Sequence, residues 1–101
     1  MSEFKRVSPV MGQEDGMYFI KCKGCGGSWH QINTKPYGGP CWTFNGNQER
    51  PTFKPSLRVR GGRFGKDHVC HSFITDGKIQ YLSDCTHHLA GQTIDLPNLD
   101  D

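Results

Sequence analysis

The sequence has no long apolar run and little of the periodicity that helices require. Hydrophobic residues make up 34% of its 101 residues, and 13 glycines and 6 prolines interrupt it. No window keeps apolar residues at helical spacing, which excludes a helical bundle. No stretch approaches the ~20 apolar residues that span a bilayer, and the polar start MSEFKRVSPVMGQEDG lacks the apolar region of a signal peptide. We therefore expect a cytoplasmic protein without a membrane-spanning segment.

The sequence also lacks a strong excess of charge of either sign. The 12 Lys and Arg nearly balance the 10 Asp and Glu, and the formal net charge of +2 does not by itself indicate nucleic-acid binding. Positive charge does gather in LRVRGGRFGK, where strand alternation would place Arg58 and Arg60 on one face. A nucleic-acid-binding surface made by Arg58, Arg60, Arg63 and Lys66 is therefore one alternative function.

The cysteines point to a metal rather than to disulfides. Five is an odd number, and a reducing compartment disfavours pairing. Cys22 and Cys25 form a C-x2-C motif followed by glycine, a spacing that lets two thiolates reach one Zn²⁺ at about 2.3 Å. A redox motif would need a helix that starts at the first cysteine, and GGSWHQIN is a poor helix start. We expect a structural zinc knuckle.

Short strands are expected along most of the chain. Aromatic and β-branched residues before and after the knuckle predict a strand on each side of it. Asp76-Gly77 predicts a type I′ hairpin between residues 69–75 and 78–83, with Ile74 opposite Ile79. By the same register Ser72 lies opposite Tyr81. Residues 93–97 offer one last short strand.

Two other local signals carry weaker expectations. Asn45-Gly46 is a frequent type I′ pair and is expected to close a short strand over residues 41–44. Residues 84–91 are expected to form a single helical turn with Asp84 as its N-cap. The fold class that results is mainly β: one small domain of short antiparallel strands and hairpins with a zinc knuckle and little helix. Its expected parts are a polar N-terminal segment (1–16), the zinc-stabilised β domain (17–97) and an acidic tail (98–101).

Two further zinc ligands must come from outside the knuckle, because there is no second C-x2-C motif. Cys70 is favoured, since the hairpin begins there between His68 and His71. Neighbouring strand residues point to opposite faces, so Cys70 and His71 can share an ion only where the strand is irregular. From the residues alone, the remaining candidates stay open: His30, Cys41, His68, His71, Cys85, His87 and His88.

Catalysis is the second alternative. Asp84 and His87 are spaced as a general-base pair or as a carboxylate that orients a metal-bound imidazole. A zinc-dependent hydrolase would use a water on an open zinc position, with one of these two residues handling protons. No nucleophile stands in a recognisable motif, so no catalytic residue is assigned beyond the candidates Asp84 and His87.

Three motifs carry a resemblance to a known family: CKGCG, WTFNGNQERPTFKPSL and CHSFITDGKIQYLSDCTHHLAGQTIDLP. Together they resemble small phage and prophage proteins of unknown function that are often labelled ammonia monooxygenases, and the likeness covers Tyr18 to Pro97. More distant relatives look like bacterial proteins encoded beside ubiquitin-like conjugation components. No residue here resembles a copper or di-iron oxygenase site.

The resemblance implies a single zinc site and a binding function. It implicates Cys22, Cys25, Cys70 and His71 as ligands, with His30, His68 and His87 as substitutes for the fourth. It implies a phage-encoded, non-enzymatic accessory protein that binds a host or phage protein in the cytoplasm of the bacterial host. Nucleic acid is a second possible partner, no membrane is expected, and the oligomeric state stays open.

Overall fold

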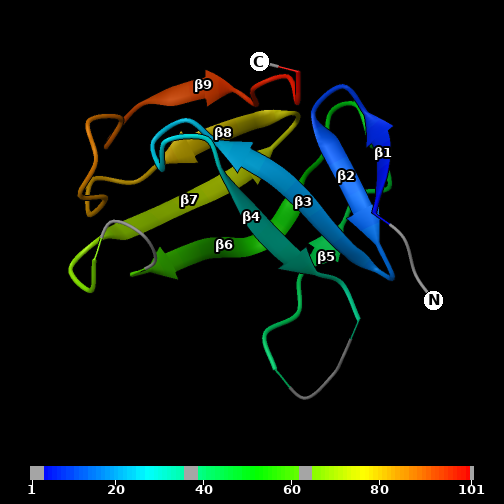
Figure 1. The fold of residues 1–101 in the computed structure, drawn as a ribbon, viewed down its shortest axis with the longest axis horizontal. Helices are drawn as coiled ribbons and strands as arrows, with labels where there is room; N and C mark the ends of the chain where they lie inside the picture. The colour runs from blue at the N-terminus through cyan, green and yellow to red at the C-terminus, as the bar shows by residue number, and fades with distance from the viewer. Residues whose placement is uncertain (1–3, 36–38, 62–64, 101) are drawn as a thin grey trace.

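Two antiparallel sheets make up the protein, as Figure 1 shows. The structure is a computed structural model and describes residues 4–35, 39–61 and 65–100. It contains nine strands and no helix over these residues, which confirms the expected all-β class. No helix that could cross a membrane is therefore present in the described part of the chain.

Sheet A is a four-stranded meander in chain order. Its strands are β1 (Lys5–Ser8), β2 (Met11–Glu14), β3 (Met17–Cys22) and β4 (Ser28–Asn33). The strands β3 and β4 flank the knuckle as expected, with Cys22 opposite Ser28. No strand was expected within residues 1–16, where β1 and β2 form, because this polar segment has too few apolar residues to show a two-residue period. Met11 is nonetheless fully buried.

Sheet B contains the other five strands, also in chain order. They are β5 (Thr43–Phe44), β6 (Phe53–Arg60), β7 (Val69–Thr75), β8 (Lys78–Tyr81) and β9 (Thr93–Asp95). The hairpin of β7 and β8 has the predicted register, with Ile74 opposite Ile79 and Ser72 opposite Tyr81. Asp76 and Gly77 both have positive φ, 51° and 76°, as a type I′ turn requires.

Two local expectations are wrong. Asn45-Gly46 does not form a type I′ turn, because only Gly46 has a positive φ. The Asn45 side chain instead accepts the N–H groups of Asn47 and Thr52 and so shapes a longer loop between β5 and β6. Residues 84–91 form turns rather than a helical turn, and the Asp84 carboxylate is directed to His71 instead of to an N-terminal amide.

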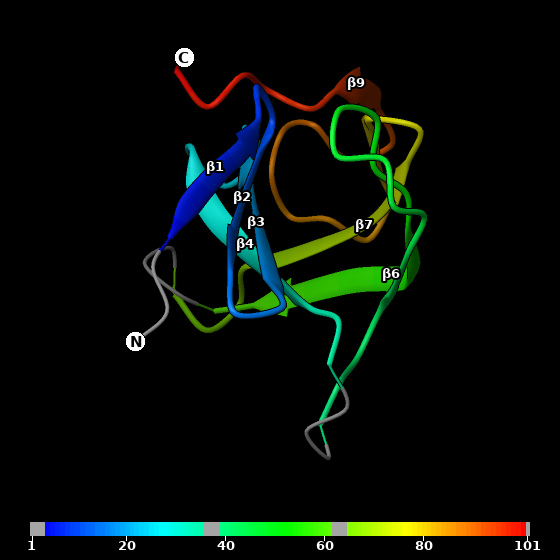
Figure 2. The ribbon, with the colours of Figure 1, turned by 90° about the vertical axis from the view of Figure 1, so that its right-hand side faces the viewer.

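The core lies between the two sheets. In Figure 2, β1 to β4 lie on the left, β6 and β7 lie below and to the right of them, and β9 lies at the upper right. Ile20 and Ile32 from sheet A and Ile74 and Ile79 from sheet B are at most 1% exposed. Tyr18 of β3 contacts an aromatic residue of sheet B, with its ring centroid 4.7 Å from that of Phe44.

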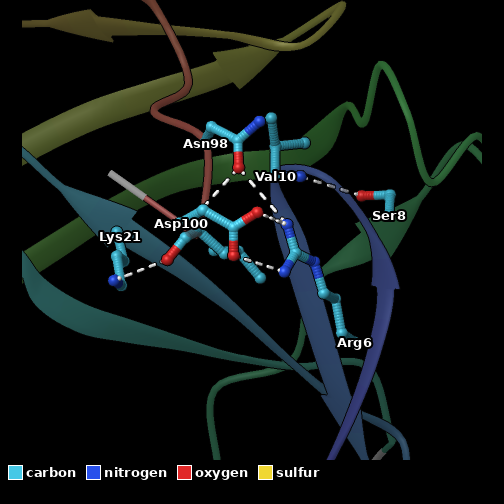
Figure 3. A network of polar contacts seen from close by, with 7 residues as sticks. Arg6, Ser8, Val10, Lys21, Asn98 and Asp100 are labelled. Carbon is cyan, nitrogen blue, oxygen red and sulfur yellow. Dashed lines mark hydrogen bonds and ion pairs between the residues drawn. The ribbon is translucent and has the colours of Figure 1, made fainter.

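The C-terminal tail returns from sheet B to sheet A. Leu99 donates its N–H to the Pro9 carbonyl at 2.8 Å, and its own carbonyl accepts a hydrogen bond of 2.8 Å from Lys21 Nζ. Asp100 pairs with Arg6 at 2.6 Å, as Figure 3 shows. Over its described residues, the acidic tail is therefore bound along sheet A.

Candidate functional site

A hydroxyl, an imidazole and a carboxylate form one hydrogen-bonded chain on sheet B. Ser56 of β6 has its Oγ 2.9 Å from Nε2 of His71 on β7. The other ring nitrogen, Nδ1, lies 3.0 Å from Oδ2 and 3.3 Å from Oδ1 of Asp84. These are the three groups, in the same order of contact, that activate the nucleophile in serine hydrolases.

Strand alternation places this chain on the outer face of sheet B. Leu57 and Cys70 are buried in the core, so their sequence neighbours Ser56 and His71 point away from it. Leu82 donates its N–H to the His71 carbonyl at 2.9 Å, and this bond leads the chain past β7 to Asp84. The His71 side chain is 24% exposed and that of Asp84 is 52% exposed, so a substrate in solvent can reach both.

Cys85 contacts the backbone of His71. Its Sγ lies 3.2 Å from both the backbone N–H and the backbone carbonyl of His71, accepting from the first and donating to the second. In the sequence, Cys85 was one of the candidates left open for a zinc ligand. Cys85 therefore ties the segment that carries Asp84 to the strand that carries His71.

This arrangement sets up a proton transfer. When the ring proton is on Nδ1, His71 donates to Asp84 and its Nε2 lone pair faces the Ser56 hydroxyl. The tautomer that accepts the serine proton is the one that the carboxylate stabilises. The geometry is thus suited to nucleophilic attack by Ser56 on a carbonyl.

A second cluster lies inside the protein. The donor atoms of Cys22, Cys25, Cys70 and His87 all lie within 4.8 Å of one another. Cys22 Sγ is 3.8 Å from Cys70 Sγ, and His87 Nε2 is 3.4 Å from Cys70 Sγ. Tetrahedral zinc with Zn–S bonds of about 2.3 Å separates its sulfur ligands by about 3.8 Å. The cluster therefore fits a metal ion in both donor chemistry and spacing.

The knuckle brings its two cysteines together through backbone hydrogen bonds. Cys25 and Gly27 both donate their N–H groups to the Cys22 carbonyl, at 3.2 and 2.8 Å. Gly27 has a φ of 86°, which a side chain would strain. Gly24 has a different role, because a Cβ at this position would overlap the ring of His87.

The three buried thiols shift one another's pKa values. The pKa of Cys22 is lowered, first because Cys70 donates a hydrogen bond to its thiolate, and also by His30 and Tyr81. Burial raises the pKa of Cys25, and the bond to Cys22 raises that of Cys70. Burial also lowers the pKa of His87, which favours the neutral imidazole that a metal requires.

The structure brings together three of the four expected metal ligands and replaces the fourth. His87, named above as a substitute, joins Cys22, Cys25 and Cys70. His71 does not, because β7 is regular at this point and alternation turns the ring to the opposite face, where both nitrogens have other partners.

Of the other expected residues, two histidines lie beside the cysteines, whereas Cys41 and the described basic residues of the alternative nucleic-acid surface are exposed. His30 and His68 border the thiol cluster, with Nε2 atoms 3.8 and 3.2 Å from Cys25 Sγ. Cys41 and Lys66 are exposed. Arg58 and Arg60 are exposed on β6, and Arg63 lies outside the described residues. Of the two catalytic candidates, Asp84 contacts His71 and His87 joins the thiols.

Ser56 was missed because nothing in its neighbourhood marks it. It follows Pro55 on a strand and is not part of a G-x-S-x-G motif, which would identify a nucleophilic serine from the sequence. Only the pairing of β6 with β7 reveals its partner, and that pairing joins residues distant in sequence.

One comparison with known proteins gives a match. A family model described as bacterial ubiquitination-like system serine protease (BubE) matches residues 2–82. The match contains Ser56 and His71 and ends just before Asp84. No curated protein and no solved structure was found to match the chain.

This match corrects two expectations. The suspected relationship to phage proteins labelled ammonia monooxygenases is replaced by a family of serine proteases. The expectation of a non-enzymatic accessory protein is wrong for the same reason, and the hydrolase alternative is closer, although the family description names a serine and not a metal-bound water. With most of its length matched, the chain belongs to the BubE family of bacterial ubiquitination-like system serine proteases.

Proposed function

We propose that the protein is a serine protease in which Ser56 is the nucleophile, His71 the general base and Asp84 the residue that orients His71. The observation that carries the proposal is the unbroken chain of hydrogen bonds from Ser56 Oγ through both His71 nitrogens to the Asp84 carboxylate. The family description supports serine chemistry independently of this geometry.

The residues act in two half-reactions. His71 Nε2 takes the hydroxyl proton as Ser56 Oγ bonds to the carbonyl carbon of the substrate, while Asp84 stabilises the imidazolium through Nδ1–H. The imidazolium then gives this proton to the leaving amine, and the acyl group stays on Ser56 as an ester. Water repeats the sequence on the ester, which releases the carboxylic acid and restores the serine.

The substrate we propose is an amide bond in a protein of a bacterial ubiquitination-like system, in the bacterial cytoplasm. The family description names that system. The placement of the triad on an outer sheet face suits it, because a protein chain can approach Ser56 without entering a closed cavity.

We further propose that the thiol cluster binds zinc for stability and not for catalysis. Three cysteines and a histidine complete a tetrahedron and leave no position for a water. Cys70 lies on the inner face of β7 and Ser56 on the outer face of β6, so the ion would not reach the substrate. A bound zinc ion would stabilise a protein with a small core, because the free energy of zinc binding adds to the free energy of folding.

A fluorophosphonate probe tests the catalytic proposal without knowledge of the substrate. It phosphonylates an activated serine, and intact-mass and peptide spectra locate the adduct. We expect labelling at Ser56, none in Ser56→Ala or His71→Ala, and unchanged labelling in Ser83→Ala, which removes an exposed hydroxyl beside Asp84. Folded protein that is not labelled at Ser56 would refute the proposal.

A further inference from the structure

The strand that carries Ser56 has an open edge next to it. On one side, β5 pairs only with Phe53 and Lys54 of β6. Beyond Ser56, residues 57–60 of β6 pair with β7, and no strand of the described residues pairs with their other side. In Figure 1 this part of β6 forms the lower border of sheet B.

The backbone groups that face this edge belong to Arg58 and Arg60. Their partners on β7, His71 and Val69, direct their own N–H and C=O groups away from β6: Val69 exchanges hydrogen bonds with Thr86, and His71 bonds to Cys85 and Leu82. Arg58 with His71 and Arg60 with Val69 are therefore non-hydrogen-bonded pairs. In such a pair the N–H and C=O groups of the β6 residue also point away from the partner strand, toward the open edge.

A second contact supports this assignment. Gly61 donates its N–H to the His68 carbonyl at 2.9 Å, so it faces β7. Alternation along the strand then directs Val59 to β7 and Arg60 to the open edge. The N–H and C=O groups of Arg58 and Arg60, which bond to no other described residue, thus form a short template for another strand, two residues from the nucleophile.

The side chains along this edge carry charge. Arg58 is the cross-strand partner of His71 and shares its face of the sheet, and Arg60 follows on the same face. Both are exposed, and neither takes part in an ion pair with any other described residue. Two guanidinium groups without an ion-pair partner in the described part of the chain therefore lie beside the triad.

We propose that the open edge of β6 binds the substrate as an extended strand, and that Arg58 and Arg60 select acidic side chains at alternate positions of that strand. Backbone bonds to the two arginine residues would supply the affinity common to any sequence, and the guanidinium groups would supply the preference. This inference rests on the proposed function, since it assigns the bound strand to the substrate of Ser56.

Binding to the Ser56→Ala protein tests the inference without turnover. The probes are fluorescein-labelled decapeptides with Glu, Gln or Lys at one position at a time, read by anisotropy. We expect two positions, two residues apart, at which Glu binds more tightly than Gln by about threefold to fivefold. Added salt should reduce this preference.

Charge reversal separates recognition from folding. Arg58→Glu and Arg60→Glu should each invert the preference at one of the two positions, so that Lys binds better than Glu there. Lys54→Gln is the matched control, because Lys54 is an exposed cation on the same strand where β5 already occupies the edge. It should leave the preference unchanged.

N-methylated peptides test strand addition itself. Methylation should weaken binding at every second residue, because only alternate N–H groups face β6. Equal effects at all positions, no preference for Glu over Gln, or tighter binding of a single-stranded oligonucleotide than of any peptide would overturn the inference. Fluorophosphonate labelling of Ser56 in the wild-type protein is read separately, and its failure would refute the proposed function instead.

Discussion

Cys70 and His71 are consecutive residues of β7 whose side chains enter two different sites on opposite faces of sheet B. Cys70 Sγ lies 3.4 Å from Nε2 of His87, inside the protein. His71 Nε2 lies 2.9 Å from the hydroxyl of Ser56, on the outer face. Because a strand directs neighbouring side chains to opposite sides, one element positions a ligand of the metal cluster and the base of the triad.

Substitutions of His87 and His71 should have different effects on zinc binding and on serine reactivity. We expect His87→Ala to lower the zinc content of the purified protein, because it removes one of four ligands. His71→Ala should retain zinc and lose fluorophosphonate labelling. Elemental analysis and mass spectrometry on the same preparations make the comparison, and loss of zinc in His71→Ala would show that the two sites are not distinct.

The carboxylate of Asp84 should matter through the ring that it orients. Asp84→Asn removes the acceptor that holds the proton on His71 Nδ1, and we expect the labelling rate to fall by about 10²-fold to 10⁴-fold. Asp95→Asn is the control, because Asp95 pairs with Lys78 away from the triad. A rate equal to that of the control would remove Asp84 from the mechanism.

Zinc binding should require a glycine at position 24, because a side chain there would displace His87. In Gly24→Ala the new methyl group would overlap the His87 ring, so the imidazole must leave its place among the thiols. We expect zinc affinity to fall by about tenfold or more, measured by competition with a chromophoric chelator. Gly39→Ala, where a Cβ meets no atom within 4 Å, should bind zinc as the unaltered protein does.

Removal of the metal should lower thermal stability. Chelation at neutral pH is expected to reduce the Tm by more than about 10 °C. The core of a domain of this size is modest and cannot compensate for the lost free energy of zinc binding. Added zinc should restore the Tm and added magnesium should not. A Tm that stays constant after demonstrated zinc removal would contradict the structural role.

The pair of Arg6 and Asp100 should stabilise the fold in a pH-dependent way. The hydrogen bond from Arg6 lowers the pKa of Asp100 below its usual value. A carboxyl whose pKa is lower in the folded state contributes stability above its unfolded pKa and loses it as the pH falls through the folded pKa. Asp100→Asn should therefore lower the Tm slightly at pH 7. It should have no effect at a pH below the folded-state pKa of Asp100, where the carboxyl of the unaltered protein is protonated.

Salt provides the control for this last prediction. The pair is exposed to solvent, so the difference in Tm between the two proteins should shrink as ionic strength rises. A difference that persists at low pH and high salt would mean that the amide disturbs packing and not charge.

Local signals in the sequence were enough for the hairpin of β7 and β8, but not for β1 and β2 or for the triad. Asp76-Gly77 predicts its hairpin because a two-residue loop determines the register of both strands. Eight residues, 61–68, separate β6 from β7, which is too many for a two-residue loop to set the register. The pairing that places Arg58 opposite His71, and with it the contact of Ser56 with His71, therefore follows from packing that the local sequence does not encode.

The fourth member of the thiol cluster shows the same limit. Alternation already argued against Cys70 and His71 at one ion, and that argument is correct for β7. The choice of His87 depends on the path of the chain after β8, where the Thr86 N–H binds the Val69 carbonyl at 2.9 Å. That contact returns the loop to β7, next to Cys70.

The cluster draws its donors from both halves of the molecule, and this bears on how the protein unfolds. Cys22 ends β3 of sheet A and Cys25 lies in the turn that follows it. Cys70 lies on β7 of sheet B, and His87 lies in the loop between β8 and β9. A bound ion would join the two sheets into one cooperative unit, so that hydrogen exchange is protected equally in both. Without it, β1 to β4 and β5 to β9 would be free to open at different free energies.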